Sequence, residues 1–333
     1  YTEVDTLSLH DALPISLSAD VDVTTLSVDN TVANVAFTGN GSSVVNAVAF
    51  ANDGTLTLGT SGGTQTYNGG LNTASVGGTV TLNGTIATSN DAIVFGAVTL
   101  GSNTIVDTNA TNGTGDITIG VVTGGNNTLT LTTENNIANA DITASGAISG
   151  VTTLTLASVG GTATLSADVD VTTLSVDNTV ANVAFTGNGS SVTNAVAFAN
   201  DGTLTLGTSG GTQTYNGGLN TASVGSTVTL NGSIVTSNDA VVLGAVTLAS
   251  ATTIDTNATN TDGDIIIGAV TGTNINLTLD TTGTTGSASH TFNGDIRLGS
   301  GALSVTGDVV LGANIIVVGG GGVTFNNDIN ADN

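Results

Sequence analysis

Apolar and polar residues alternate with a period of two along almost the whole chain. The alternation is clear at 55–58, 79–82, 116–119 and 153–156, where every second residue is Val, Leu or Ile. This pattern is typical of β-strands with one buried face, and apolar residues do not recur at the three- and four-residue spacing of a helix. Clusters of Gly, Asn, Asp and Ser separate the runs, for example at 39–41 and 61–63, and predict turns. We therefore predict an all-β protein.

The predicted strands recur at an irregular interval of roughly 18–26 residues, which is the sequence signature of a solenoid. Each turn of such a fold holds two or three short strands, and successive turns stack in parallel about 4.8 Å apart. We predict a parallel β-helix of roughly 14 turns over residues 16–333, with Val, Leu and Ile inward and Thr, Asn and Asp outward. Tandem β-sandwich domains are the structural alternative, although no recurrent Trp or Pro-containing linker supports them.

A near-identical duplication runs through the chain with an offset of 148 residues. Residues 17–131 and 165–279 pair without a gap, and 98 of the 115 paired residues are identical. The differences are mild, such as Val45 against Thr193 and Phe95 against Leu243. We expect one continuous solenoid in which residues 16–163 form the first copy. Residues 164–333 form the second copy and end in diverged turns.

The duplication stops abruptly upstream of Leu17. Residues 1–15 read YTEVDTLSLHDALPI and share nothing with SGVTTLTLASVGGTA at 149–163. The string TLSLHDALPI resembles one translation frame of a widely used sequencing adapter. We therefore expect residues 1–15 to be a non-native segment of metagenomic origin and leave them out of the fold prediction. The remaining chain is expected to be an internal fragment of a longer protein.

Composition and charge exclude several classes of function. The chain has 25 Asp and Glu, one Lys or Arg, no Cys and a formal charge of −24, while 39% of its residues are hydrophobic. This apolar content is sufficient for a packed core. The lack of Cys excludes disulfides and thiolate metal sites. A single cation cannot neutralise a row of phosphates, so we expect no nucleic-acid partner. No apolar run is long enough for membrane insertion of this segment.

The repeats at 96–120, 244–268 and 153–176 resemble a known class of surface protein. They read GAVTLGSNTIVDTNATNGTGDITIG, GAVTLASATTIDTNATNTDGDIIIG and TLTLASVGGTATLSADVDVTTLSV. They look like the β-strand repeats of filamentous-haemagglutinin-like and autotransporter-like bacterial adhesins. This resemblance implies a right-handed parallel β-helix that is extracellular or at the bacterial cell surface, associated with the outer membrane. It also implies partners among host or environmental surface glycans or proteins, besides the neighbouring repeats of the same chain.

Together these features favour a non-enzymatic structural or adhesive segment of a large secreted bacterial surface protein. Such a segment would serve as a stiff rod for cell adhesion or for multivalent surface binding. A polysaccharide-processing β-helix enzyme is the first alternative and would need carboxylates that converge in a groove. A surface-layer protein would share the low pI and the lack of Cys. An ice-binding protein would need the outward Thr-x-Thr pairs, such as Thr55/Thr57 and Thr79/Thr81, to form a continuous uncharged face.

Paired carboxylates are the candidate metal ligands. Asp20 and Asp22 stand two residues apart, and Asp168 and Asp170 repeat the pair in the second copy. We expect each pair to lie on one face of a strand, where a hard cation such as calcium would relieve the repulsion between the carboxylates. A solvated acidic edge is the plainer interpretation. We predict no catalytic residue and no other cofactor.

His290 and Arg297 are the remaining residues with chemistry of their own. Arg297 follows Asp295 by two residues in an alternating run, which predicts an exposed ion pair on one face of a strand. For His290 we predict a surface position, because no carboxylate other than Asp295 lies within six residues. A Ser-His-Asp arrangement built from distant turns is the alternative for this histidine.

Overall fold

The structure is a computed structural model that describes residues 4–10, 13–111, 114–135, 139–257, 262–282 and 288–331. The described residues are all-β, and their parallel stacked strands form a β-solenoid of about 15 turns. The predicted fold class is therefore confirmed. The turn number predicted from the sequence left out residues 1–15, in which a first strand and the start of a second one lie.

The chain divides into two compact units, residues 1–171 with 179–181 and residues 172–178 with 182–333. β19 (Val169–Val176) contains the division between them. No described residue belongs to a helix long and apolar enough to cross a membrane. The predicted boundary of the two repeat copies, between residues 163 and 164, stays a prediction.

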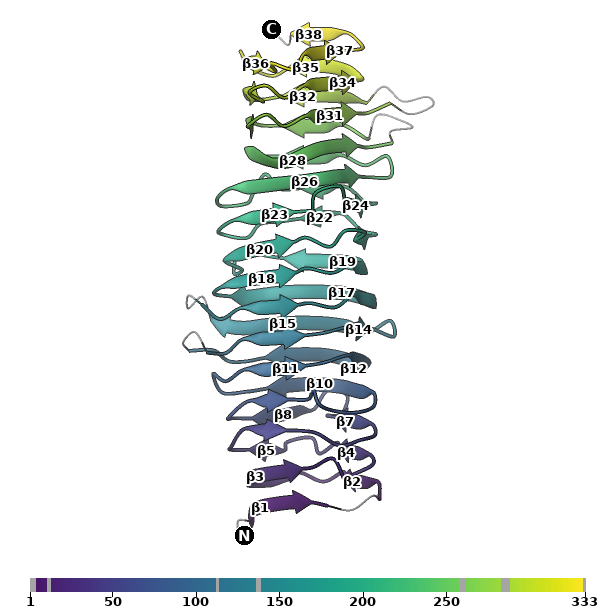
Figure 1. The fold of residues 1–333 in the computed structure, drawn as a ribbon, viewed down its shortest axis with the longest axis vertical. Helices are drawn as coiled ribbons and strands as arrows, with labels where there is room; N and C mark the ends of the chain where they lie inside the picture. The colour runs from purple at the N-terminus through teal and green to yellow at the C-terminus, as the bar shows by residue number, and fades with distance from the viewer. Residues whose placement is uncertain are drawn as a thin grey trace. The chain divides into compact units, whose positions relative to one another are not determined.

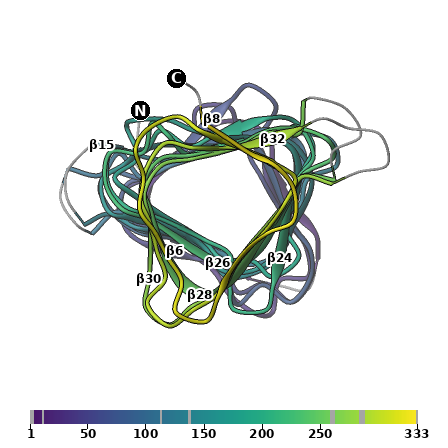
Figure 2. The ribbon, with the colours of Figure 1, turned by 90° about the horizontal axis from the view of Figure 1, so that it is seen from above.

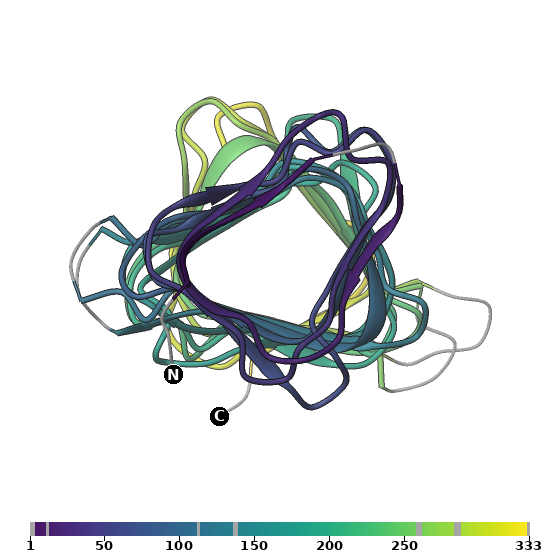
Figure 3. The same cartoon turned by 90° about the horizontal axis from the view of Figure 1, so that it is seen from below.

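Turns of the first unit have three sides, each carrying one parallel ladder (Figures 1 and 3). The first side runs through β2 (Ile15–Leu17), β4 (Val35–Phe37), β7 (Leu56–Leu58), β10 (Val80–Ala87), β12 (Val98–Asp107), β14 (Val122–Thr123) and β17 (Ile148–Val159). The second side holds β1 (Val4–Leu9), β3 (Asp22–Val28), β5 (Ser43–Val44), β8 (Thr64–Tyr67), the ends of β10 and β12, β15 (Thr128–Asn135) and the end of β17. The third side holds β6 (Val48–Ala49), β9 (Leu71–Asn72), β11 (Ile93–Phe95), β13 (Ile117–Ile119), β16 (Ile142–Ala144) and β18 (Thr162–Leu165).

The second unit repeats this three-sided plan, as the green and yellow turns of Figure 2 show. Its first side runs through β20 (Asn182–Phe185), β23 (Leu204–Leu206), β26 (Val228–Val235), β28 (Val246–Asp255), β30 (Val270–Gly272), β33 (Ile296–Arg297) and β36 (Val317–Val318). The second side holds β21 (Ser191–Val192), β24 (Thr212–Tyr215), the ends of β26 and β28, β31 (Leu277–Asp280), β34 (Leu303–Thr306) and β37 (Val323–Phe325). The third side holds β22 (Val196–Ala197), β25 (Leu219–Asn220), β27 (Val241–Leu243), β29 (Ile265–Ile267), β32 (Ser289–Phe292), β35 (Asp308–Leu311) and β38 (Ile329–Ala331).

The core consists of apolar columns in which equivalent residues of successive turns stack on one another. On the third side of the first unit, for example, Ile93 pairs in register with Ile117, and Ile117 pairs with Ile142; all three are fully buried. Each such side chain contributes about 1.5–3 kcal/mol of hydrophobic stabilisation when it is fully buried. The period-two pattern of the sequence therefore places Val, Leu and Ile inward, as predicted.

The core also contains polar side chains that the alternation did not predict. Gln65 Nε2 donates to the carbonyl oxygens of Phe37 at 2.7 Å and Gly39 at 3.2 Å, and the Tyr67 hydroxyl donates to Gln65 Oε1 at 3.0 Å. Both side chains are fully buried, and their hydrogen bonds offset the free-energy cost of removing polar atoms from water. The second unit repeats the arrangement with Gln213 and Tyr215. Burial raises the pKa values of both tyrosine hydroxyls.

Insertions at the corners and within strands explain the irregular strand spacing. The register of β10 against β12 shifts between Leu82 and Gly84, so that β12 holds extra residues on its exposed side. Gly84 adopts φ 65°, and a Cβ there would lie 2.3 Å from the Thr60 carbonyl oxygen. Only glycine fits this position. The turns therefore vary in length while the inward columns stay in register.

Candidate functional site

The predicted acidic pair of the first unit lies at a corner between two sides. Asp20 precedes β3 and Asp22 is its first residue; both side chains are exposed. Asp20 Oδ1 accepts a hydrogen bond from the Gly41 backbone N–H at 2.7 Å. Gly41 belongs to the next turn, so the Asp20 carboxylate connects two successive turns.

The equivalent pair of the second copy lies on both sides of Val169 at the start of β19. Asp170 is exposed, whereas Asp168 is half-buried, and the Asp168 carbonyl oxygen accepts the Ile148 N–H at 2.9 Å. The described residues contain no group of three or more His, Cys, Asp or Glu side chains that could hold a metal ion. Calcium takes six to eight oxygen ligands, so water would have to supply most of the shell at either pair. The calcium site stays a prediction.

Corner Asp and Asn residues in both units use their side chains as Asp20 does. In each case Oδ1 accepts the backbone N–H of a residue one turn further along the chain. The pairs are Asn34 with Thr55, Asp116 with Asp141, Asp141 with Thr162, Asn182 with Thr203, Asp264 with Ser289 and Asp295 with Ile316. A corner amide has no strand partner, so a side-chain oxygen satisfies it. Several Asp residues therefore help to hold successive turns together. The sequence analysis did not predict this role, although Asp and Asn recur at about the length of one turn.

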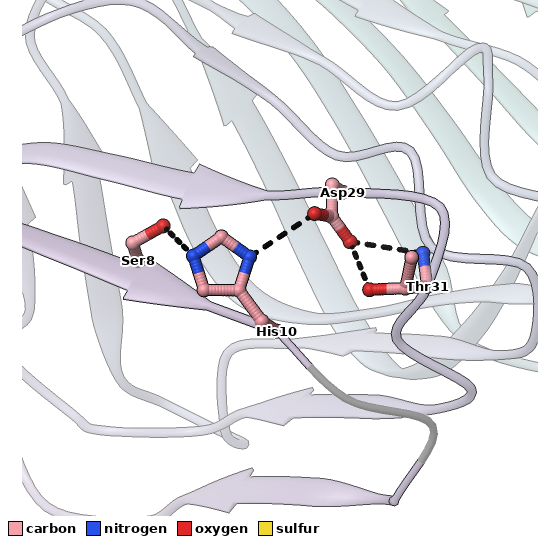
Figure 4. A network of polar contacts seen from close by, with 4 residues as sticks. All are labelled: Ser8, His10, Asp29 and Thr31. Carbon is pink, nitrogen blue, oxygen red and sulfur yellow. Dashed lines mark hydrogen bonds and ion pairs between the residues drawn. The ribbon is translucent and has the colours of Figure 1, made fainter.

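A Ser–His–Asp network lies near the start of the first unit (Figure 4). Ser8 Oγ is 2.6 Å from His10 Nε2, and His10 Nδ1 is 3.1 Å from Asp29 Oδ2. The order of these atoms is that of a hydrolytic triad. Asp29 also accepts the Thr31 backbone N–H at 2.9 Å. Hydrogen bonds from the Thr31 side chain and backbone, and then from His10, hold the pKa of Asp29 below its usual range.

The surroundings of this network do not support catalysis. The side chain of His10 is 61% exposed and that of Asp29 42% exposed, so water screens the interactions on which a triad depends. Ser8 and His10 also belong to the segment that we expect to be non-native. The network joins β1 to the turn after β3, and we assign no catalytic role to it.

The predicted ion pair between Arg297 and Asp295 is confirmed. Arg297 Nη2 donates to Asp295 Oδ2 at 2.8 Å, with both side chains exposed on β33 and the turn before it. The pKa of Asp295 is lowered first by the Ile316 backbone N–H and then by Arg297. Exposed pairs of this kind contribute about 0–1 kcal/mol to stability. Arg297, the single Lys or Arg of the sequence, is therefore a surface residue whose ion pair adds little stability.

The predicted surface position of His290 is wrong. His290 is fully buried in the core of the second unit and stacks in register on Ile265 of β29. It lies two residues before the equally buried Phe292, at a ring distance of 6.4 Å. That aromatic neighbour is the sequence signal for an inward position, because residues two apart in a strand share a face. Three carboxylates, Asp264, Asp280 and Asp308, influence its pKa from other parts of the fold.

The first side of each unit carries an uncharged strip of outward residues, here called the threonine strip. In the first unit it consists of Thr55, Thr57, Thr79, Thr81, Ala97, Thr99, Val121 and Thr123. Its second column is continuous in register from Thr57 through Thr81 and Thr99 to Thr123. The second unit repeats the strip with Thr203, Thr205, Thr227, Thr229, Ala245, Thr247, Ala269 and Thr271. The strips themselves contain no Asn or Asp; such residues lie elsewhere, for example Asn72 on β9 and Asn83 within β10.

The described residues form a shallow hollow on the surface of each unit. The hollow of the first unit lies on the third side and is lined mainly by small residues, among them Ala47, Gly70 and Ala92. The hollow of the second unit lies on the threonine strip, between Thr227, Ala245 and Thr271. Among the described lining residues, the first hollow includes one carboxylate, Asp91, and the second hollow includes none.

The fold defines this chain as a β-solenoid repeat protein. In comparisons with known proteins, no family model, no curated protein and no solved structure matches it.

Proposed function

We propose that the chain is a non-enzymatic structural and adhesive segment of a large secreted bacterial surface protein. The observation that carries this proposal is the use of the polar side chains. Corner Asp and Asn residues hold neighbouring turns together, while the outward face of the first side presents uncharged hydroxyl and methyl groups. This distribution suits a spacer with a repeated binding surface better than an enzyme.

Multivalency is the proposed mechanism. The hydroxyl groups of Thr57, Thr81 and Thr99 recur at the strand spacing of about 4.8 Å. One such contact is weak, but several engaged at once on a surface glycan or protein raise the avidity by roughly 10²–10⁴-fold. The second unit carries a strip of the same chemistry, with Thr205, Thr229 and Thr247 in register.

Ice binding is the second candidate, and the threonine strip is the observation that favours it. Each strip extends over four turns without a charge, and its Thr column keeps an unbroken register. A regular array of hydroxyl and methyl groups on a sheet can order water. The strip of the second unit ends at the charged pair Asp295 and Arg297, which occupy the next turn.

Surface binding by the full chain tests the proposal. The chain is coated on beads at several densities and offered arrays of surface glycans and proteins. We expect retention that rises steeply with coating density, and no reducing ends or unsaturated products from a polysaccharide panel. Product formation with turnover would instead support the enzyme alternative, and binding independent of density would contradict the multivalent mechanism.

Paired substitutions locate the binding surface. Thr81→Glu together with Thr229→Glu places a charge on the threonine strip of both units, and we expect at least a tenfold loss of retention. Thr143→Glu together with Thr291→Glu is the matched control, because these residues project from the third side at equivalent positions of both units. Thermal hysteresis in the same variants separates the candidates: activity lost only in the strip variant would favour ice binding.

A further inference from the structure

His290 occupies a core position that the first unit fills with isoleucine. In the first unit Ile117 of β13 pairs in register with Ile142 of β16. In the second unit the equivalent Ile265 of β29 pairs with His290 of β32. Both Ile142 and His290 are fully buried. The chain therefore contains the same site twice, once with an apolar side chain and once with an ionisable one.

The hydrogen bonds of the ring define its tautomer. His290 Nε2 lies 3.1 Å from the Thr306 carbonyl oxygen, which can only accept, so Nε2 carries the hydrogen. The Thr281 hydroxyl lies 3.3 Å from the same nitrogen and donates to the Ala288 carbonyl oxygen. Nδ1 then holds a bare lone pair. It is buried and has no hydrogen-bond partner among the described residues.

Protonation would therefore create a poorly supported charge. A proton taken up from solvent would bind at Nδ1 and form an N–H that has no acceptor among the described residues. A buried donor left unsatisfied costs about 1–3 kcal/mol, and more when the group is charged. The new N–H can gain an acceptor only if water reaches the ring. The surrounding strands must then separate at least locally.

Among the described residues, three carboxylates act on the charge of the ring. Asp264 precedes β29 on the turn below, Asp280 ends β31, and Asp308 starts β35 on the turn above. Asp264 Oδ1 accepts the Ser289 N–H and Asp280 Oδ1 accepts the Thr282 N–H, so both are held at the periphery. They attract a proton toward the site without contacting Nδ1. Residues 283–287 contain no ionisable side chain in the sequence.

We propose that His290 is an acid-sensitive latch in the core of the second unit, whose protonation loosens the turns that contain β31, β32, β34 and β35. The equivalent turns of the first unit have Ile142 in its place and stay closed. The latch does not depend on the function proposed above.

The direction in which pH changes the stability of the closed state follows from the pKa of His290. Burial lowers the pKa of His290 below its ordinary value of 6.5, against weaker opposing contributions from the Thr306 carbonyl and the three carboxylates. The open, solvated ring therefore binds a proton more readily than the closed one. The closed state is fully favoured above about pH 6.5 and loses stability as the pH falls from there toward the lowered pKa.

Amide hydrogen exchange on the full chain tests the latch. Exchange is measured by mass spectrometry at pH 7.5 and 5.5, with rates corrected for intrinsic pH dependence. We expect protection in residues 277–311 to fall at the lower pH by at most about tenfold, because pH 5.5 lies about one unit below the ordinary pKa of histidine, while residues 129–163 show no such loss. This window lies above the ordinary pKa of Asp, so the carboxylates keep their charge.

The two copies supply matched variants. His290→Ile should abolish the pH-dependent loss in 277–311, and Ile142→His should create one in 129–163. An equal loss in the His290→Ile variant, or no loss in the unmodified chain, would overturn the proposal. If a variant does not fold, the imidazole signals of the unmodified chain decide the matter. The chain has two histidines, and a folded-state pKa of 6.5 or above for His290 would contradict the latch.

Discussion

Tyr67 donates its hydroxyl hydrogen to Gln65 Oε1 across 3.0 Å, with both side chains fully buried in the core of the first unit. The two residues are two positions apart on β8 and therefore point the same way. Gln65 in turn donates to the carbonyl oxygens of Phe37 and Gly39. The pair thus extends the hydrogen bonding of the backbone into the core.

Removing the tyrosine hydroxyl should destabilise the first unit. Tyr67→Phe leaves Gln65 Oε1 buried without its donor, and we expect a loss of about 1–3 kcal/mol in the free energy of unfolding. Denaturant titration measures this value. The double variant Gln65→Leu with Tyr67→Phe should be less stable still, because it also removes the Nε2 donor of the Phe37 and Gly39 carbonyl oxygens. A Tyr67→Phe variant as stable as the parent would show that the hydrogen bond contributes nothing.

Gly307 should tolerate no side chain. Its φ is 125°, and a Cβ would lie 2.0 Å from Thr281 Oγ1 and 3.0 Å from His290 Nε2. We expect Gly307→Ala to lower the free energy of unfolding by more than about 1–3 kcal/mol, since a clash adds to the backbone strain. Gly62→Ala is the matched control: Gly62 also has positive φ, 73°, but an added Cβ has nothing within 4 Å. Equal losses in the two variants would refute the clash.

Asp20 should act through its hydrogen bond to Gly41 rather than through its charge. Asp20→Asn keeps an acceptor oxygen for the Gly41 N–H, so we expect a change of less than about 0.5 kcal/mol, whereas Asp20→Ala should cost about 1 kcal/mol. Thermal melts measure both values. Repeating the melts with millimolar calcium tests the metal prediction: a rise in Tm that Asp20→Asn and Asp22→Asn abolish would establish a calcium site.

The exposed strands β37 and β38 should make the 333-residue polypeptide self-associate. Val323 and Ile329 are 40% and 48% exposed, although Leu303 and Val309, their register partners on the preceding turn, are buried. Strand edges with exposed apolar residues pair with other chains. We expect concentration-dependent association in sedimentation velocity, reduced by Val323→Lys with Ile329→Lys. Val45→Lys is the control, since Val45 is 53% exposed far from these strands in the sequence; an equal effect there would contradict the assignment.

Local pattern was sufficient to predict the strands and the solenoid. Residues 79–82, for example, alternate strictly between polar and apolar. This alternation alone predicts that Val80 and Leu82 point inward, without reference to neighbouring turns. The prediction for His290 was wrong because few carboxylates lie near it in the sequence, whereas its alternation with Phe292 indicates an inward position. The offset of 148 also aligns His290 with Ile142, a core residue, so this burial could have been predicted.

The acidic pairs illustrate what local pattern could not provide. Asp20 and Asp22 do lie two residues apart at an exposed edge, but the partner of Asp20 is Gly41, which follows 21 residues later. A contact across turns depends on corner lengths, and these vary. The same holds for the contact between the His290 ring and the Thr306 carbonyl oxygen, which joins residues 16 positions apart.

The sequence by itself determined that this protein is all-β, that its strands stack in repeated turns, and that its chemistry excludes thiols and rows of cations. These conclusions depend on composition and on a period of two, which are properties of single segments. The tertiary structure alone decided that the threonine strips are continuous, that corner acids bond to the next turn, and that His290 Nδ1 has no hydrogen-bond partner among the described residues. Each of these depends on register between turns, and register is set by how the inward columns pack.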